Sequence, residues 1–128
     1  MDRHLVVGAG AVGRQVATLL ADRGARVTVA SRSGRSTGID GVEHLALDAT
    51  DPDALSRAAE HAAVLYNCAN PAAYTQWEAR WPPLAASFLA AAERTGAVYA
   101  ITGNLYPYGP VDGPLTEELP DAATDHKG

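Results

Sequence analysis

Short apolar runs alternate with longer segments of helical periodicity over most of the chain. Runs that are rich in valine and alanine and bounded by glycine or polar residues are typical of strands covered on both faces. We therefore expect a strand at each such run: His4–Val7, Arg26–Ala30, Glu43–Leu47, Ala63–Asn67 and Ala97–Thr102.

Stretches between these strands carry apolar residues at helical spacing, which predicts helices with one buried face. The first helix runs from about Ala11 to Arg23 and ends at Gly24, because glycine suits the position after a helix. The second begins at Asp51-Pro52, because proline suits the first helical position. The expected buried faces consist of Val12, Val16, Leu19 and Leu20 in the first helix and of Leu55, Ala58, Ala59 and Ala62 in the second.

A third helix passes through Trp77 and Trp81 and ends at Gly96. Pro82-Pro83 either restarts this helix or kinks it. The two tryptophans lie four residues apart on one face, which favours packing over base stacking. The expected buried face consists of Leu84, Phe88, Leu89 and Ala92.

The turn between the first strand and the first helix carries glycines in the pattern G-x-G-x-x-G. Gly8 allows a tight turn, Gly10 lets a pyrophosphate approach the backbone, and Gly13 lets the helix pack close to the strand. The N–H groups of Ala11 and Val12 would then hold the phosphates. The alternative is a glycine-rich turn with no ligand.

Strands and helices that alternate around this motif predict an α/β fold of the Rossmann type, which is a doubly wound parallel sheet. Right-handed crossovers give the strand order 3-2-1-4-5 and bring ligands to the carboxyl ends of the first and fourth strands. The segment Ser31–Gly41 has no apolar period and is expected to be a loop.

Two regions are expected along the chain. Residues 1–102 form the dinucleotide-binding core, with the sheet truncated before its last strands. Residues 103–128 hold four prolines and no long periodicity. We expect this second region to be an active-site loop and a tail that lead to an absent C-terminal part.

The residues after the second strand indicate which cofactor binds. An NAD site usually offers an acid there to the ribose 2′-hydroxyl. This chain has Ser31 and Arg32, with Ser33 and Arg35 close behind. A guanidinium with hydroxyl groups binds a 2′-phosphate, so NADP is expected rather than NAD. The alternative is a solvated basic loop.

Two further strand ends offer cofactor contacts. Asp48 is placed either to accept a hydrogen bond from the adenine amino group or to form a turn with its own side chain. Thr50 or Asp51 is expected to cap the next helix. Ala69 is small enough for its backbone to approach the nicotinamide ribose, and Cys68 is expected to be a buried small residue.

The segment after the fifth strand places a hydroxyl, an amide and a phenol where substrate would meet the nicotinamide. These candidates for the reaction are Thr102, Asn104 and Tyr106. The alternative is that the tyrosines of this segment anchor a loop rich in proline and glycine.

Composition excludes several classes of function. The chain has 128 residues and a formal net charge of −5, with no basic footprint for nucleic acid or an anionic membrane. Its one cysteine excludes an internal disulfide, and without a signal-peptide pattern we expect a cytoplasmic protein. The expected partners are a small-molecule substrate and, as a candidate, a second copy in a homodimer. Metal-ligand spacing is absent among the histidines, which are His4, His44, His61 and His126.

Several of these stretches together resemble the NAD(P)-dependent epimerase/dehydratase family of extended short-chain dehydrogenase/reductases. They are the glycine motif, Asp48, Asn67–Ala69, Tyr108-Gly109-Pro110 and Leu115–Glu118. The resemblance implies a Rossmann domain followed by a smaller substrate domain. It also implies hydride transfer from a hydroxyl of a nucleotide sugar or similar substrate to bound nicotinamide, before epimerisation, dehydration or reduction. In this family a Ser or Thr polarises the reacting oxygen, and a Tyr with a Lys four residues later is the acid/base.

The chain departs from the family pattern in three places. Its glycine pattern is G-x-G-x-x-G where many members have G-x-x-G-x-x-G, Asn104 stands at the usual hydroxyl position, and no Tyr-x-x-x-Lys is present. We therefore expect the NADP-binding portion of an atypical epimerase/dehydratase-like oxidoreductase that is inactive by itself. The alternative is a non-catalytic NAD(P)-binding redox sensor or regulatory module, which the missing Tyr/Lys pair favours.

Overall fold

The computed structural model describes residues 1–71, 73–125 and 127–128, so His126 lies outside the described residues. Strands and helices alternate through the first hundred residues. The elements are, in order, β1 Arg3–Val7, α1 Ala11–Asp22, β2 Arg26–Ser31, β3 Val42–Ala46, α2 Pro52–Ala59, β4 Ala62–Asn67, the 3₁₀ turn η1 Tyr74–Gln76, α3 Trp77–Thr95, β5 Val98–Ile101 and the 3₁₀ turn η2 Tyr106–Tyr108.

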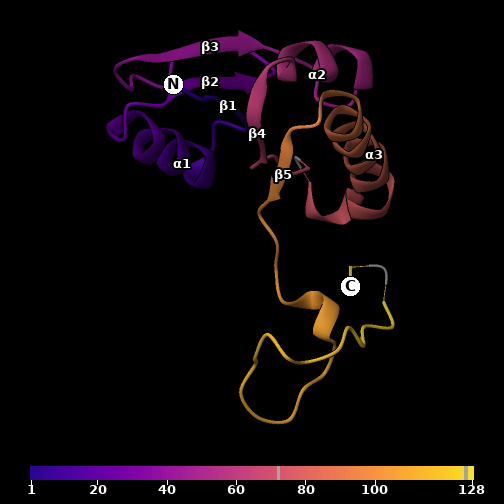
Figure 1. Ribbon diagram of the computed structural model, residues 1–128. Helices are drawn as coiled ribbons and strands as arrows, with labels where there is room; N and C mark the ends of the chain where they lie inside the picture. The colour runs from indigo at the N-terminus through magenta and orange to yellow at the C-terminus, as the bar shows by residue number, and fades with distance from the viewer. Residues whose placement is uncertain (72, 126) are drawn as a thin grey trace.

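A parallel sheet in the order β3-β2-β1-β4-β5 forms the centre of the fold, with α1 on one face and α2 and α3 on the other (Figure 1). This is the expected Rossmann-type α/β fold, and the predicted strand order is confirmed. Val7 at the end of β1 pairs with Ala30 of β2 on one side and with Asn67 of β4 on the other. The carboxyl ends of these three strands therefore meet where the strand order reverses.

Two separate hydrophobic cores bind the helices to the sheet. Phe88 of α3 belongs to the core that contains Leu5 and Leu65, and all three side chains are fully buried. Ala17 of α1 belongs to the core on the opposite face, with Val6. Successive strand residues point to opposite faces, so Leu5 and Val6 contribute to different cores.

The buried face of α1 differs from the expected one. Val12 and Leu19 are 47% and 52% exposed, whereas Gly13 and Ala17 are buried. Residues four positions apart share a helix face, and these two small residues let the helix lie close to the sheet. The larger apolar side chains are left at the edge of the contact, so the expectation that Val12 and Leu19 are buried is wrong.

The buried face of α3 differs at one leucine. Leu84 and Phe88 are buried as expected, but Leu89 is 53% exposed, and Ser87 and Ala91 are buried instead. The buried positions 84, 88 and 91 follow helical spacing, and residue 89 lies about 100° around the helix from residue 88. The expected place of Leu89 in the core is therefore wrong.

The two prolines of α3 do not interrupt it. The helix runs through Pro82 and Pro83 to Thr95. The backbone bonds that the prolines cannot donate would reach the carbonyls of Glu78 and Ala79, which are exposed residues of the first turn.

α3 ends at Gly96, as predicted, and this glycine is in the left-handed conformation. Gly96 has a φ of 72°, and its N–H donates to the carbonyl of Ala92 (2.9 Å). Ala92 itself is half-buried.

Other boundaries move by a few residues. Ala62, expected on the second helix, is the first residue of β4, because α2 ends at Ala59 and the chain turns at His61 with a φ of 63°. β3 begins and ends one residue earlier than expected. β5 is confined to Val98–Ile101, so Thr102 lies just beyond it.

Beyond β5 the chain leaves the sheet as a tail, residues 103–128, which extends away from the core (Figure 1). The tail folds back on itself after η2, because the N–H groups of Ala122 and Ala123 both donate to the carbonyl of Pro107 (2.8 and 3.0 Å). Among the helices of the described residues, none is both long and apolar enough to cross a membrane.

Candidate functional site

The turn between β1 and α1 requires glycine at two positions. Gly8 has a φ of 110°, and a Cβ there would lie 2.5 Å from the carbonyl oxygen of Cys68. A Cβ on Gly13 would overlap the carbonyl oxygen of Gly8. Both contacts are with backbone atoms, which cannot rotate away as a side chain would. These two glycines therefore let the strand, the turn and the helix lie close together.

Gly10 differs because the space around it is open. Apart from Gly10 itself and the residues on either side of it, no described atom lies within 4 Å of the position that its Cβ would take, and its φ of −79° suits other residues. Gly10 is the N-cap of α1, no described side chain caps this helix, and Ala11 and Val12 are exposed. The first N–H groups of α1 therefore face solvent, an arrangement that binds anions. This open surface fits the pyrophosphate of a dinucleotide.

The loop after β2 starts with a tight turn. The Oγ of Ser31 accepts a hydrogen bond from the N–H of Gly34 (3.1 Å), and the N–H of Leu47 donates to the carbonyl of Ser31 (2.8 Å). The Arg32 side chain, between these anchored points, is exposed. The structure therefore presents Arg32 to solvent at the carboxyl end of β2, where a ribose would lie.

Asp48 forms a turn just after β3. Its Oδ1 accepts hydrogen bonds from the hydroxyl (2.7 Å) and the N–H (3.0 Å) of Thr50. These bonds hold the pKa of Asp48 below its ordinary value, and the charge of Arg32 adds to the shift. Asp51, and not Thr50, caps α2 by accepting from two N–H groups of its first turn. The turn role of Asp48 is thus observed, and its contact with adenine stays a prediction.

A buried amide shapes the end of β4. Asn67 is 1% exposed; its Oδ1 accepts from the N–H of Ala69 (3.2 Å), and its Nδ2 donates to the hydroxyl of Tyr99 on β5 (3.0 Å). These bonds fix the turn that carries Ala69, because buried polar groups keep their partners. This role of Asn67 was not expected from the sequence. Its signal is a polar residue at the end of an apolar strand.

Thr102 lies beside the glycine turn. Its hydroxyl donates to the Sγ of Cys68 (3.8 Å), and its N–H donates to the carbonyl of Asn67 (3.0 Å). The N–H of Cys68 in turn donates to the carbonyl of Val7 at the end of β1 (2.8 Å). The structure therefore places Thr102 and Cys68 next to the surface where a dinucleotide would lie.

Asn104 and Tyr106 lie farther along, in the tail. The Oδ1 of Asn104 accepts from the N–H of Tyr106 (2.9 Å), and the Tyr106 ring lies 6.4 Å from the Trp77 ring at the start of α3. The η2 segment that holds Tyr106 extends away from the sheet (Figure 1). Asn104 therefore bonds within the tail, and the Tyr106 ring packs against α3.

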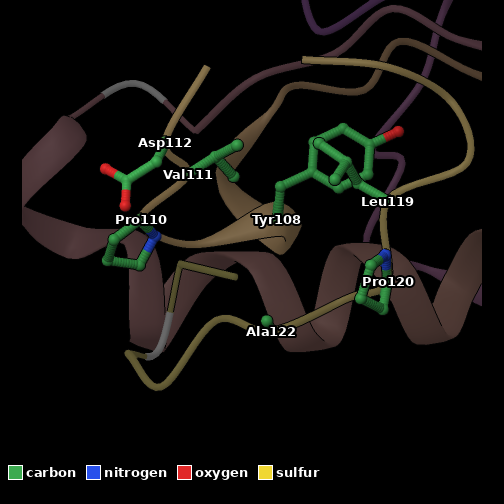
Figure 2. Close-up of a pocket in the computed structure, with 7 residues that line it drawn as sticks. All are labelled: Tyr108, Pro110, Val111, Asp112, Leu119, Pro120 and Ala122. Carbon is green, nitrogen blue, oxygen red and sulfur yellow. The ribbon is translucent and has the colours of Figure 1, made fainter. Parts of the chain in front are cut away.

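A cavity of about 280 Å³ lies within the tail (Figure 2). It is lined by Tyr108, Pro110, Val111, Asp112, Leu119, Pro120 and Ala122. None of the candidate site residues lines this cavity, so the surface at the glycine turn is the better candidate site. Over the described residues, no group of three or more His, Cys, Asp or Glu is arranged to hold a metal ion.

The thiol of Cys68 offers a test of this geometry. Burial raises its pKa above the ordinary value by more than the hydrogen bond with Thr102 lowers it. Alkylation needs the thiolate, so at pH 7.5 iodoacetamide should label Cys68 about fivefold or more slowly than it labels glutathione. Mass spectrometry of the native chain measures the rate, and the chain in urea is the control. Equal rates in native and unfolded chains would contradict the burial.

Comparison with known proteins identifies the domain. A family model described as the saccharopine dehydrogenase NADP binding domain matches residues 4–108. The chain belongs to this family. The match includes the glycine turn, Arg32 and Thr102, so all the strand ends described above lie inside the matched residues.

Solved structures with a similar fold include epimerases and reductases. A Burkholderia cenocepacia protein provisionally assigned as an epimerase has a TM-score of 0.79 and 23% identity, over 98% of this chain and 45% of its own. The UDP-glucose 4-epimerase from Brucella ovis, solved with NAD, has a TM-score of 0.77 and 19% identity, over 96% of this chain and 42% of its own. Vestitone reductase from alfalfa, Medicago sativa, has a TM-score of 0.67 and 22% identity, over 80% of this chain and 36% of its own.

The chain spans less than half the length of each of these three proteins. At such identities the likeness shows the fold, and the resemblance to the epimerase/dehydratase family is confirmed at that level. No protein of curated function matches the sequence significantly. Family and fold together make the chain a Rossmann domain for a nicotinamide dinucleotide.

Proposed function

We propose that the chain is the NADP-binding portion of an epimerase/dehydratase-like oxidoreductase. The whole protein would move a hydride between nicotinamide and a hydroxyl or carbonyl carbon of a small molecule, such as a nucleotide sugar. The observation that carries the proposal is the open surface at Gly10, where the uncapped start of α1 meets the carboxyl ends of the strands. Gly8 and Gly13 shape this surface, and the N–H groups of Ala11 and Val12 would bind the pyrophosphate.

The loop after β2 supports NADP over NAD. Arg32 is exposed beside Ser31, where an NAD site would offer an acid. A guanidinium can bind a phosphate through two parallel hydrogen bonds, and the Ser31 hydroxyl can donate a third. Asp48 would accept from adenine, because hydrogen bonds from Thr50 hold its pKa low and its carboxylate is ionised at neutral pH.

Thr102 is the residue that we propose to meet the substrate oxygen, near the nicotinamide ribose at Ala69. Oxidation of an alcohol sends a hydride to nicotinamide and the hydroxyl proton to a base. The Thr102 hydroxyl can donate a hydrogen bond to the reacting oxygen, but it keeps its own proton at neutral pH. We assign the base to a part of the protein outside these 128 residues. The domain alone would then bind cofactor without turnover.

The experiment that tests the cofactor assignment is Arg32→Glu. The new carboxylate repels the 2′-phosphate, so the Kd for NADPH should rise about 10- to 100-fold while the Kd for NADH changes less than about threefold. Fluorescence titration of both cofactors measures this. Arg57→Glu, on the exposed face of α2, is the control for the same change in charge. An unchanged NADPH preference in Arg32→Glu would refute the assignment.

The alternative, a non-catalytic NADP-binding sensor, is favoured by one observation. Asn104 and Tyr106, two of the three candidates for the reaction, are engaged in contacts within the tail and with Trp77 of α3. Turnover by the full-length protein with NADP and a panel of hydroxyl and carbonyl substrates would decide against the sensor. Cofactor binding with no turnover of any substrate in the panel would favour it.

A further inference from the structure

The loop between β2 and β3, residues 32–41, is attached to the fold at its centre by residues outside the predicted site. Arg14 follows the last glycine of the turn on α1, and its Nη2 donates to the carbonyl oxygen of Thr37 (2.8 Å). Thr37 is 6% exposed, which is unusual for a polar residue in a loop otherwise rich in exposed side chains. The helix of the glycine turn is therefore linked directly to the loop that carries Arg32.

The same threonine is bound from the other side by β3. The N–H of Thr37 donates to the Nε2 of His44 (2.9 Å), and the Thr37 hydroxyl lies 2.8 Å from the same nitrogen. A backbone N–H can only donate, so this ring nitrogen must accept and carries no proton. His44 lies opposite Val29 in the sheet, which fixes its backbone. Thr37 is thus held between α1 and β3.

A second anchor lies nearer the start of the loop. Gly34 has a φ of 65°, its N–H donates to the Oγ of Ser31, and a Cβ on it would lie 2.7 Å from the backbone nitrogen of Ala46. The anchors at Gly34 and Thr37 flank Arg35, and the turn closed by Ser31 contains Arg32. Both arginines are exposed on a backbone that is fixed at each side.

We propose that Arg14 and His44 are positioning residues for the 2′-phosphate of NADP. They hold Thr37 and thereby keep the loop ordered. Arg32 is then presented to the phosphate without the loss of conformational entropy that ordering a free loop would require. This inference rests on the proposed NADP-binding function. NAD has no 2′-phosphate, so its affinity should depend on the loop far less than that of NADP. Arg14 and His44 therefore set the preference between the two cofactors.

Removing either anchor should weaken the binding of NADPH but not that of NADH. If the binding-competent conformation of the loop is then only about 10% populated, the Kd for NADPH rises about tenfold. We expect this for Arg14→Leu and His44→Leu, with the Kd for NADH changed less than about twofold. His44→Gln keeps an acceptor for the Thr37 N–H and should retain most of the preference. Arg23→Leu, at the residue directly after the end of α1 and with a bond to the Leu19 carbonyl, is the matched control.

Titrations of NADPH and NADH against each variant give the result. A merely structural role would weaken both cofactors together, and that outcome would overturn the inference, as would an unchanged NADPH preference in Arg14→Leu. Arg14 is exposed, so Arg14→Leu should still fold. It can therefore be used for the test if His44→Leu does not fold. A wild-type chain that binds NADPH no more tightly than NADH would instead overturn the proposed function, which keeps the two failures apart.

The double variant Arg14→Leu/His44→Leu adds a second criterion. Both residues act through Thr37, so their effects on the Kd for NADPH should not multiply, and the double variant should match the weaker binder of the two within about threefold. A roughly hundredfold loss in the double variant would mean that the two residues act independently, and it would overturn the shared role.

Discussion

Replacing Gly13 with alanine is expected to lower the free energy of unfolding by about 3 kcal/mol or more. The added Cβ would overlap the carbonyl oxygen of Gly8. Gly8 cannot move to make room, since it is itself packed on the backbone of Cys68 and its N–H is bonded to the carbonyl of Ala30 (2.9 Å). The helix would have to leave the sheet, which would expose Ala17 and the core beneath it.

Urea unfolding followed by circular dichroism measures this loss. Gly103→Ala is the matched control, because no described atom outside Gly103 and its two chain neighbours lies within 4 Å of the position of its Cβ. It should change the free energy of unfolding by less than about 0.5 kcal/mol. If Gly13→Ala were as stable as the control, the close approach of α1 to β1 would be wrong.

Replacing Gly10 with valine should have the opposite profile, with little change in stability and loss of the cofactor. The site is open and its φ of −79° suits valine, so the free energy of unfolding should fall by at most about 1 kcal/mol, because valine is a poorer N-cap than glycine. The branched side chain would cover the N–H groups that we propose bind the pyrophosphate. The Kd for NADPH should therefore rise about 100-fold.

Titration with both NADPH and NADH measures the second effect, and both cofactors should weaken alike because both contain the pyrophosphate. Gln15→Val, an exposed position one turn farther along α1, is the control and should bind normally. Normal binding by Gly10→Val would show that the pyrophosphate lies elsewhere. Together with Gly13→Ala, this variant separates the glycine that shapes the turn from the glycine that leaves space for the ligand.

The fold could be predicted because its signals are local. The strands are continuous apolar runs, the glycine motif marks the first turn, and Gly96 marks the end of α3. The helix faces were harder to predict. Leu89 is apolar but exposed, because the closest approach of two elements depends on small residues such as Ala91 and on the angle around the helix.

In the candidate site, too, some features could be predicted from the sequence and others could not. The glycine turn, Arg32 and Thr102 are marked by their positions after strands, and the structure places them at the carboxyl ends of the sheet. The link between Arg14 and His44 could not be predicted, because it passes through the backbone of Thr37, and every residue has a carbonyl and most have an N–H.

The sequence by itself determined the strand order, the glycine turn and the cofactor class, because each follows from residues that are neighbours along the chain. Only the tertiary structure decided that Gly10 faces open space while Gly13 is enclosed, and that the Tyr106 ring packs against Trp77 of α3. It alone also showed that the loop with Arg32 is anchored from two sides. The physical reason is that these facts depend on distances between segments far apart in the chain, which close packing sets and local patterns do not record.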